Sequence, residues 1–292
     1  MEQNEQNSCP ACGSNQAIPY LEVKDHFLTG EVFQLLKCSN CELIYTTPRP
    51  DKDEIGNYYK SEDYVSHSST KKGIVNSVYN VVRNYTLNQK VKLVQSLVEG
   101  KELLDVGAGT GHFLKRAQDN GFSVLGLEPD PDARNVGKDQ LQVELKDLSE
   151  LYSLSKKNYD ALTMWHVLEH VYDLKSDTEQ FVSLIKSGGV FIIAVPNYTS
   201  YDAEYYKEFW AAYDVPRHLY HFSPASIIPF VEQFGLTLEK MLPMKFDAYY
   251  VSMLSEKYKG GSLLNAFKIG NKSNRRAKNG KCSSQIYVFR KK

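Results

Sequence analysis

Short apolar segments alternate with segments of helical period along most of the chain from residue 101 onward. The predicted strands cover 101–106, 123–128, 141–145, 159–165 and 189–195, and the predicted helices cover 111–120, 131–138 and 174–187. Strands that alternate with helices favour a parallel sheet covered by helices on both faces, and strands buried on both faces are apolar throughout. The pattern therefore predicts an α/β fold.

The flanking segments extend this pattern. Apolar residues of one helical face predict a helix over 74–98; they are Leu87, Val91, Val94 and Val98. Ser223 and Pro224 are typical of a helix start, and that helix is expected to end at Gly235. We predict two final strands at 236–250 and 283–290. The stretch 255–281 is rich in Lys, Gly, Ser and Asn and is expected to be mobile.

The first candidate for chemistry is the turn after the strand 101–106. Asp105 is followed by Gly107, Gly109 and Gly111, and the next strand ends at Glu128, 23 residues after Asp105. Glycines let the backbone approach a ligand closely, and a carboxylate at the position of Glu128 can accept hydrogen bonds from both hydroxyls of a ribose. We therefore predict that this β-α-β unit binds an adenosine-containing ligand. The spacing differs from the Gly-x-Gly-x-x-Gly of dinucleotide sites, which disfavours an NAD-dependent oxidoreductase.

Four of the five cysteines form two Cys-x-x-Cys pairs separated by 25 residues; they are Cys9, Cys12, Cys38 and Cys41. Four thiolates suit tetrahedral zinc, and a closed shell of protein ligands indicates a structural metal. Residues 22–36 read as strand, turn and strand, which would bring the two pairs together. The segment resembles a zinc ribbon, and disulfides are the alternative.

The composition indicates which classes of binding partner and which cellular location to expect. Lys and Arg together equal Asp and Glu at 35 each, so no overall field favours nucleic acid. The N-terminal residues contain no recognisable secretory signal, and the apolar runs are too short to cross a bilayer, so we expect a cytoplasmic protein.

Three further motifs join the glycine turn in a resemblance to a known family. They are Trp165-His166-Val-Leu-Glu169-His170, the run Ser187–Asn197, and Pro216-Arg217-His218-Leu-Tyr-His221-Phe. Over about residues 85–290 the chain resembles class I S-adenosylmethionine-dependent methyltransferases of the ubiquinone-biosynthesis-like group, and the ribbon resembles that of sugar methyltransferases. The resemblance implies a Rossmann-like seven-stranded sheet, in which the two final strands are antiparallel neighbours.

The resemblance also assigns residues to S-adenosylmethionine. Gly107, Ala108 and Gly109 would line its methionine part, and Asp105 would anchor its amino group. Glu128 would take the ribose, Pro129 would pack beside the adenine, and Asp147 would accept from the adenine amino group. Trp165 and His166 would close the site beneath the sulfonium. Glu169 is interpreted either as a structural partner or as a catalytic group, and His170 mainly as structural.

The resemblance places the acceptor pocket after the fifth strand, where a base would deprotonate the acceptor. His221 and His218 are the candidates, with His221 slightly preferred. Arg217 is expected to hold an anionic group of the acceptor, or alternatively to pair with a core acid. Tyr58, Tyr59, Tyr64 and His67 are candidates for a lid.

These inferences predict a zinc-ribbon module over 1–50, a lid and helical linker over 51–100, and a methyltransferase domain over 101–292. The expected acceptor is a small molecule, for example a sugar nucleotide, a glycan or a secondary-metabolite intermediate. An RNA methyltransferase that binds RNA through the ribbon is the alternative, supported by the basic run 274–281. A fold without catalysis is a further one, disfavoured by Asp105, the glycines and Glu128. The residues leave the oligomeric state open.

Overall fold

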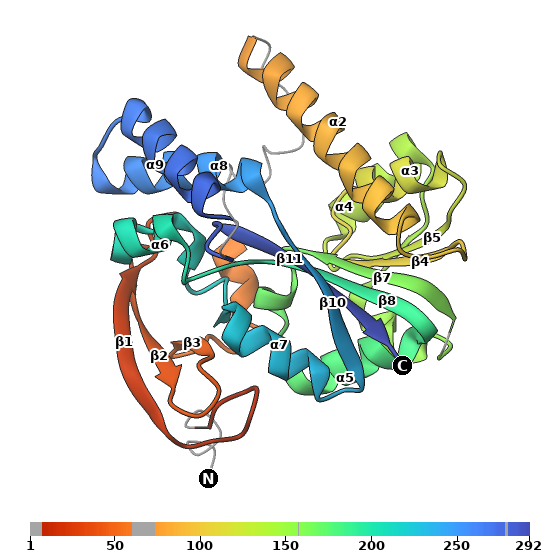
Figure 1. Cartoon of the computed structure of the whole chain (residues 1–292), viewed down its shortest axis with the longest axis horizontal. Coiled ribbons are helices and arrows are strands. Elements are labelled where there is room, and N and C mark those ends of the chain that lie inside the picture. Colours follow the sequence, from red (N-terminus) through yellow and green to blue (C-terminus); the bar gives the residue numbers. More distant parts are fainter. Residues whose placement is uncertain (1–7, 60–73, 157, 278–279) are drawn as a thin grey trace.

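The computed structural model describes residues 8–59, 74–156, 158–277 and 280–292, with side chains of the first helix described from residue 81. A seven-stranded sheet forms its centre, in the order β10-β11-β8-β7-β4-β5-β6 (Figure 1). Its strands are β4 (Glu102–Val106), β5 (Ser123–Leu127), β6 (Leu145–Lys146), β7 (Tyr159–Trp165), β8 (Ile185–Pro196), β10 (Leu236–Pro243) and β11 (Ser284–Lys291). β11 is antiparallel to both β8 and β10, while the strands from β8 to β6 are parallel. The predicted α/β sheet is thereby confirmed.

Helices cover both faces of this sheet (Figure 1). The helices α2 (Ile74–Gln95), α3 (His112–Gln118) and α4 (Pro131–Val136) lie on one side, and α5 (Leu174–Leu184) and α7 (Pro224–Glu232) lie on the other. Side chains alternate along a strand, so Val190 and Ile192 of β8 join the core that contains Val91 and Val94 of α2. Phe191 and Ile193 join the opposite core. This division explains why β8 is apolar at consecutive positions.

The N-terminal segment forms a second sheet of four strands, in the order β1-β2-β3-β9. Its strands are β1 (Ala17–Lys24), β2 (Val32–Cys38), β3 (Ile44–Thr47) and β9 (Tyr220–His221). β1 and β2 are antiparallel, as the strand–turn–strand pattern predicts. The carboxylate of Asp25 accepts hydrogen bonds from the backbone N–H groups of Phe27 and Thr29, at 3.0 Å each, and so shapes the turn between them. β9 comes from the chain after β8, and an isolated bridge between Asn197 and Phe222 connects this sheet to the end of β8.

Several element boundaries differ from the prediction. The segment predicted as a strand at 141–145 begins with the end of a π-helical turn (Gly137–Leu141), and only β6 pairs at the sheet edge. The helix predicted over 174–187 ends at Leu184, because β8 begins at Ile185. The chain also contains α6 (Tyr201–Tyr206) and the 3-10 turns η2 (Ile55–Tyr59), η5 (Leu148–Ser153), η6 (Leu168–His170), η7 (Lys207–Phe209) and η8 (Ala211–Tyr213).

The largest correction concerns residues 244–277. The strand predicted over 236–250 ends at Pro243, and α8 (Lys245–Lys259) follows. The stretch expected to be mobile contains the end of α8 and the helix α9 (Leu263–Arg276), which packs on α8. A side chain at Gly270 would come within 2.8 Å of the Tyr249 ring, so glycine permits this close packing. In the described ranges, no helix is both long enough and apolar enough to cross a bilayer.

Candidate active site

The glycine turn lies at the carboxyl end of β4, between β4 and α3. Gly107, Gly109 and Gly111 have φ angles of +69°, +54° and +82°, which glycine adopts at little cost. A side chain at Gly107 would collide with Val167. At Gly109 the space on the corresponding side is open, because no heavy atom lies within 4 Å of a Cβ built there. The turn therefore offers an open backbone surface at the sheet edge where ligands of α/β folds bind.

Glu128 holds this turn in place. One carboxylate oxygen accepts from the Gly109 N–H at 2.7 Å, and the other accepts from the Asp130 N–H at 3.0 Å. The side chain is 8% exposed, and burial raises the pKa of Glu128 despite these hydrogen bonds. A carboxylate oxygen has two lone pairs, so Glu128 can accept further hydrogen bonds from a ligand.

Asp105 lies below the turn, at 2% exposure. The Thr163 hydroxyl donates to its carboxylate at 2.5 Å. Burial raises the pKa of Asp105 to about 7, and the hydrogen bond from Thr163 and the charge of Lys90 offset only part of this effect. Asp105 is therefore a buried acid that a cationic group would stabilise in its charged form.

Lys90 of α2 is a site residue that the sequence interpretation missed. Its Nζ lies 4.3 Å from the centroid of the Trp165 ring, and burial lowers the pKa of Lys90 while Asp105 and Asp247 oppose this shift. The helical pattern indicated only the apolar face of α2. The sequence did contain a signal for this site, namely a lysine beside Val91 on the apolar face of the helix. Lysines are rarely buried without a partner, so a lysine there indicates a nearby acid or ring.

The adenine side of the turn is less enclosed. Pro129 is exposed, and Asp147 accepts from the Ser149 N–H at 2.9 Å and forms an ion pair of 2.8 Å with Arg134. These contacts lower the pKa of Asp147, with the Ser149 backbone as the largest cause. Both residues lie at the same sheet edge as Glu128, and their roles toward the adenine stay predictions.

His166 follows β7 and lies between two carboxylates. Its Nε2 donates to Asp247 of α8 at 2.8 Å, and its Nδ1 lies 3.3 Å from Glu169. Burial lowers the pKa of His166, but the hydrogen bonds to Asp247 and Glu169 outweigh it and raise the value to about 10. His166 is therefore an imidazolium at neutral pH. Asp247 was missed because its segment was predicted to be a strand.

Trp165 packs edge-on against Phe113, with ring centroids 5.5 Å apart. Its indole N–H is buried, and among the described residues it has no hydrogen-bond acceptor. An unsatisfied buried donor is costly in a folded protein. The N–H is thus available to a ligand atom that enters this part of the site.

The segment 214–221 borders the same sheet edge from the other side. The Leu219 N–H donates to the carbonyl of Glu169 at 2.8 Å, which joins the segment to η6. His218 donates from Nδ1 to the Ala212 carbonyl at 2.9 Å, and its ring packs on His170 with centroids 4.6 Å apart. His221 is 4% exposed and contacts the Thr46 hydroxyl through Nε2 at 3.1 Å. Both candidate bases lie in this segment.

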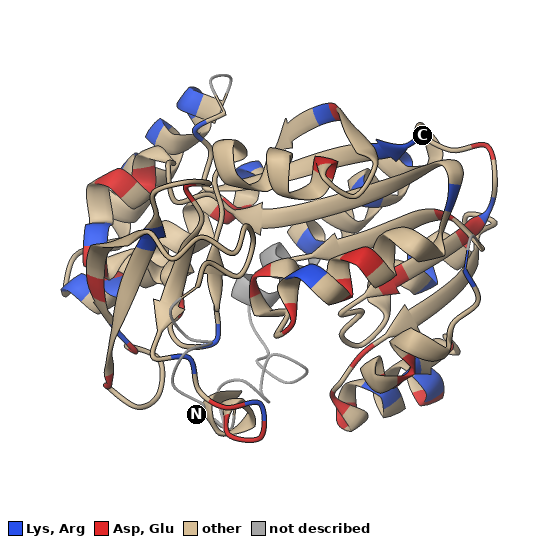
Figure 2. Ribbon diagram, turned by 90° about the horizontal axis from the view of Figure 1, so that it is seen from below, with Lys and Arg blue, Asp and Glu red and all other residues tan. Residues whose placement is uncertain are grey.

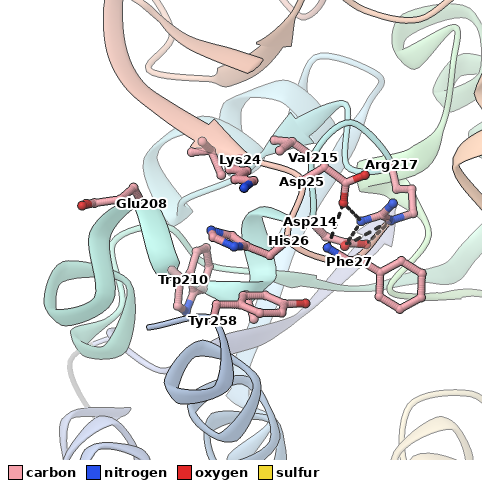
Figure 3. A pocket seen from close by; sticks show the side chains of 12 residues that line it. Lys24, Asp25, His26, Phe27, Glu208, Trp210, Asp214, Val215, Arg217 and Tyr258 are labelled. Atoms are coloured by element: carbon pink, nitrogen blue, oxygen red, sulfur yellow. Dashed lines mark hydrogen bonds and ion pairs between the residues drawn. The ribbon is translucent and has the colours of Figure 1, made fainter. Parts of the chain in front are cut away.

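Arg217 is 1% exposed and contacts acids of the chain itself (Figure 3). It forms ion pairs of 2.9 Å with Asp25 and 2.7 Å with Asp214. These pairs raise the pKa of Arg217 against the effect of burial. The geometry thus matches the structural alternative for Arg217, and its guanidinium is already committed.

The predicted lid residues diverge. The Tyr59 hydroxyl lies 3.0 Å from Nδ1 of His170, whereas the Tyr58 hydroxyl donates to Glu31, in the turn between β1 and β2, at 2.8 Å. Tyr64 and His67 lie outside the described residues. His170 donates from Nδ1 to the Arg217 carbonyl at 3.0 Å, and burial together with His218 lowers the pKa of His170 to about 4. It is therefore neutral, as suits a structural contact.

The four cysteines of the two Cys-x-x-Cys pairs come together at one end of the N-terminal sheet. Their sulfur atoms all lie within 4.8 Å of one another. The Cys9–Cys41 and Cys12–Cys38 sulfur distances are 3.5 and 3.6 Å. A tetrahedral zinc shell with Zn–S bonds of about 2.3 Å requires sulfur atoms about 3.8 Å apart. The arrangement fits a zinc ion.

Comparison with known proteins agrees with this geometry. The family model described as "Methyltransferase domain" matches residues 82–241. An uncharacterized methyltransferase of Alkaliphilus oremlandii is 28% identical over 125 residues, which cover 42% of this chain and 56% of that protein. A ubiquinone biosynthesis O-methyltransferase of Pelagibacter ubique is 24% identical over 180 residues, which cover 58% of this chain and 73% of that protein.

Solved structures share the fold at low identity. Magnesium protoporphyrin IX methyltransferase from Synechocystis, with bound SAH, has a TM-score of 0.56 and 14% identity, covering 83% of this chain and all of that one (100%). A putative sarcosine dimethylglycine methyltransferase from Galdieria sulphuraria has a TM-score of 0.53 and 16% identity, covering 82% of this chain and 98% of that one. The fold is thus the Rossmann-like class I fold that the motifs predict.

Proposed function

Because this chain belongs to the methyltransferase-domain family and is an S-adenosylmethionine-dependent methyltransferase, we propose that it methylates a small-molecule acceptor by in-line transfer. The observation that carries the proposal is that two features share one sheet edge. One is the open backbone at Gly109, and the other is the histidine-containing segment joined to η6. A donor and a proton acceptor on facing sides of one edge suit methyl transfer to a polar acceptor.

The residues of the turn fit the cofactor. Glu128 would accept from the ribose hydroxyls, and a buried Asp105 would hold the ammonium of the methionine part. Gly107, Ala108, Gly109 and Gly111 would line that part, while Trp165 and His166 would enclose it. S-adenosylmethionine supplies a methyl group that its sulfonium already activates. The chain's residues therefore mainly orient the reactants and exclude water.

His221 and His218 are the proposed proton acceptors. Each ring forms a hydrogen bond with the protein through one nitrogen. A neutral ring that donates through this nitrogen has a lone pair on the other nitrogen. His166 is unsuited to this role, because an imidazolium held by two carboxylates has no lone pair to offer. A base is needed whether the acceptor is a hydroxyl or a carbon beside a carbonyl.

The acceptor is proposed to be small and polar. One relative is named for ubiquinone biosynthesis, which is small-molecule chemistry. Basic residues and acidic residues are both spread over the molecule (Figure 2). This distribution does not favour a polyanion such as RNA. β9 pairs with the outer edge of β3, so no strand of a partner can add to the ribbon at that edge.

Zinc is proposed to bind Cys9, Cys12, Cys38 and Cys41 as a structural ion. With four protein ligands it has no open position for a substrate. Its role would be to stabilise the N-terminal sheet, because metal binding by a site that the unfolded chain lacks contributes to folding.

Calorimetry tests the cofactor assignment and a labelled-methyl assay tests the acceptor class. We expect heat on titration with S-adenosylmethionine or S-adenosylhomocysteine and none with NAD. Pools of small metabolites and of RNA are then offered with tritiated donor. Label in the RNA pool alone contradicts the proposed acceptor class, and no binding of either donor form contradicts the cofactor assignment.

A further inference from the structure

The N-terminal sheet and the segment with the candidate bases are joined by direct strand pairing. β3 pairs with β9 in an antiparallel register that sets Ile44 opposite His221 and Tyr45 opposite Tyr220. The Thr46 N–H donates to the Leu219 carbonyl at 3.0 Å. The cysteine-bearing module is thus in direct contact with the segment that carries both histidines.

Thr46 contacts both histidines through one hydroxyl. The hydroxyl donates to the His218 carbonyl at 2.7 Å, and Nε2 of His221 lies 3.1 Å from the same oxygen. A hydroxyl has a single proton, and a carbonyl can only accept. Because that proton goes to His218, the contact with His221 requires Nε2–H to donate to the Thr46 oxygen.

This contact determines the state of the His221 ring. A neutral imidazole carries one proton, so a ring with Nε2–H has its lone pair on Nδ1. Thr46 and His221 are 3% and 4% exposed, so little water competes for the contact. The Tyr213 ring packs edge-on at 5.2 Å and restricts the His221 ring further. Burial, with a smaller effect of His218, lowers the pKa of His221 well below its usual value, so the ring is neutral at physiological pH.

We propose that Thr46 is a positioning residue that holds His221 as the Nε2–H tautomer and so presents Nδ1 as the proton acceptor. The inference rests on the proposed function, in which His221 serves as a base. The cysteine-bearing module then acts in catalysis from a distance, through strand β3. Fixing the tautomer of a base with a third group is a general device of acid–base catalysis.

The experiment compares two variants of Thr46 with a control on the same strand. Thr46→Val keeps the shape and removes the hydroxyl, and Thr46→Ser restores it. Thr47→Val is the control, because alternate side chains of a strand point to opposite faces. We expect Thr46→Val to lower kcat by about 10- to 100-fold, a part of the roughly 100- to 10,000-fold that general acid–base catalysis contributes, because the ring is still present but no longer held in one tautomer. Thr46→Ser and Thr47→Val should stay near the wild-type kcat, and all three should bind S-adenosylmethionine as the wild type does.

Nitrogen-15 NMR of the histidine rings gives a readout that a purely structural role would not change. We expect the wild-type His221 ring to be the Nε2–H tautomer and the Thr46→Val ring to be a mixture of both tautomers. A wild-type kcat in Thr46→Val, or a wild-type ring with Nδ1–H, overturns the inference. Should Thr46→Val fail to fold, the wild-type spectrum and the kcat of Thr46→Ala, which also lacks the hydroxyl, decide in its place.

Failure of the underlying proposal is separable. Full activity of His221→Gln would remove His221 as the base while leaving the tautomer measurement valid. In that case Thr46 would orient the ring without a part in catalysis, and the inference would fail at the catalytic step alone.

Discussion

The two sides of the active site are built differently. On the cofactor side, Asp105, the glycine turn and Glu128 lie within one β-α-β unit, and the 2.7 Å contact between Glu128 and Gly109 spans 19 residues. On the acceptor side, the contact between Thr46 and His221 spans 175 residues, and that between Arg217 and Asp25 spans 192. The glycine turn and its two acids are therefore local, whereas the proposed acceptor side depends on the N-terminal sheet being docked. Damage to one side should spare the other.

Removing the proposed zinc should have the largest effect. Loss of a structural zinc that contributes about 10 kcal/mol or more is expected to unfold the N-terminal sheet and release β9. Cys38→Ala, or chelation of the wild type, should abolish methyl transfer, while calorimetry should still detect S-adenosylmethionine binding. Cys282→Ala is the matched control, since this cysteine lies outside the cluster. Full activity in a metal-free chain would contradict the prediction.

Arg217→Met should follow in size. It leaves the carboxylate of Asp25, which is 2% exposed, without its cation, and breaking such a buried pair costs about 3–5 kcal/mol of the free energy of unfolding. Urea denaturation measures this change. Lys281→Met is the control, because the ion pair of Lys281 with Glu204 is exposed and contributes little. Equal loss in both variants would speak against a special role for the Arg217 cluster.

Glu128→Gln should weaken the cofactor side alone. The amide replaces one acceptor oxygen with a donor, so a contact with Gly109 or Asp130 is lost along with the proposed charge-assisted contacts to the ribose. Losses of about 1.5–3 kcal/mol correspond to about 10- to 100-fold weaker binding of S-adenosylmethionine in calorimetry. Glu144→Gln, on the neighbouring surface and 67% exposed, should bind normally. A Glu128 variant with unchanged affinity would remove this residue from the ribose site.

The smallest expected effect is a pH dependence of cofactor affinity. The pKa of Asp105 is about 7, so the carboxylate becomes protonated as pH falls through that value and no longer attracts an ammonium. For one such proton, linkage predicts about fivefold weaker binding of S-adenosylmethionine at pH 6 than at pH 7. Asp105→Asn should bind weakly at both values and lose the dependence. A dependence that survives in this variant would assign the titration to another group.

Sequence reasoning succeeded where the residues that contact one another lie close together along the chain or where the residue type implies its partner. The spacing of Asp105, the glycines and Glu128 predicted the turn and its place at a sheet edge. The paired cysteines predicted a cluster, and alternating strands and helices predicted the sheet. In each case the relevant contacts lie within one supersecondary unit, or the residue type itself implies the partner.

It failed where small residues decide packing between segments. The strand predicted over 236–250 includes Phe246 and Tyr250, yet both are exposed side chains of α8. The polar stretch after residue 255 was predicted to be mobile, yet its buried Gly270 packs against α8 and its buried Ser273 donates to Asp202 of α6. Asp247 was lost with α8, although it is the acid that keeps His166 charged.

The sequence by itself therefore determined the family, the sheet and the cofactor turn, because those depend on residues close along the chain. Tertiary structure alone decided that the His221 ring contacts the Thr46 hydroxyl, that Asp25 pairs with Arg217, and that the cysteine-bearing module pairs with the segment of the candidate bases. These pairings join segments far apart in the chain, and their energies depend on burial and exact partners. No local pattern of residue types records that information.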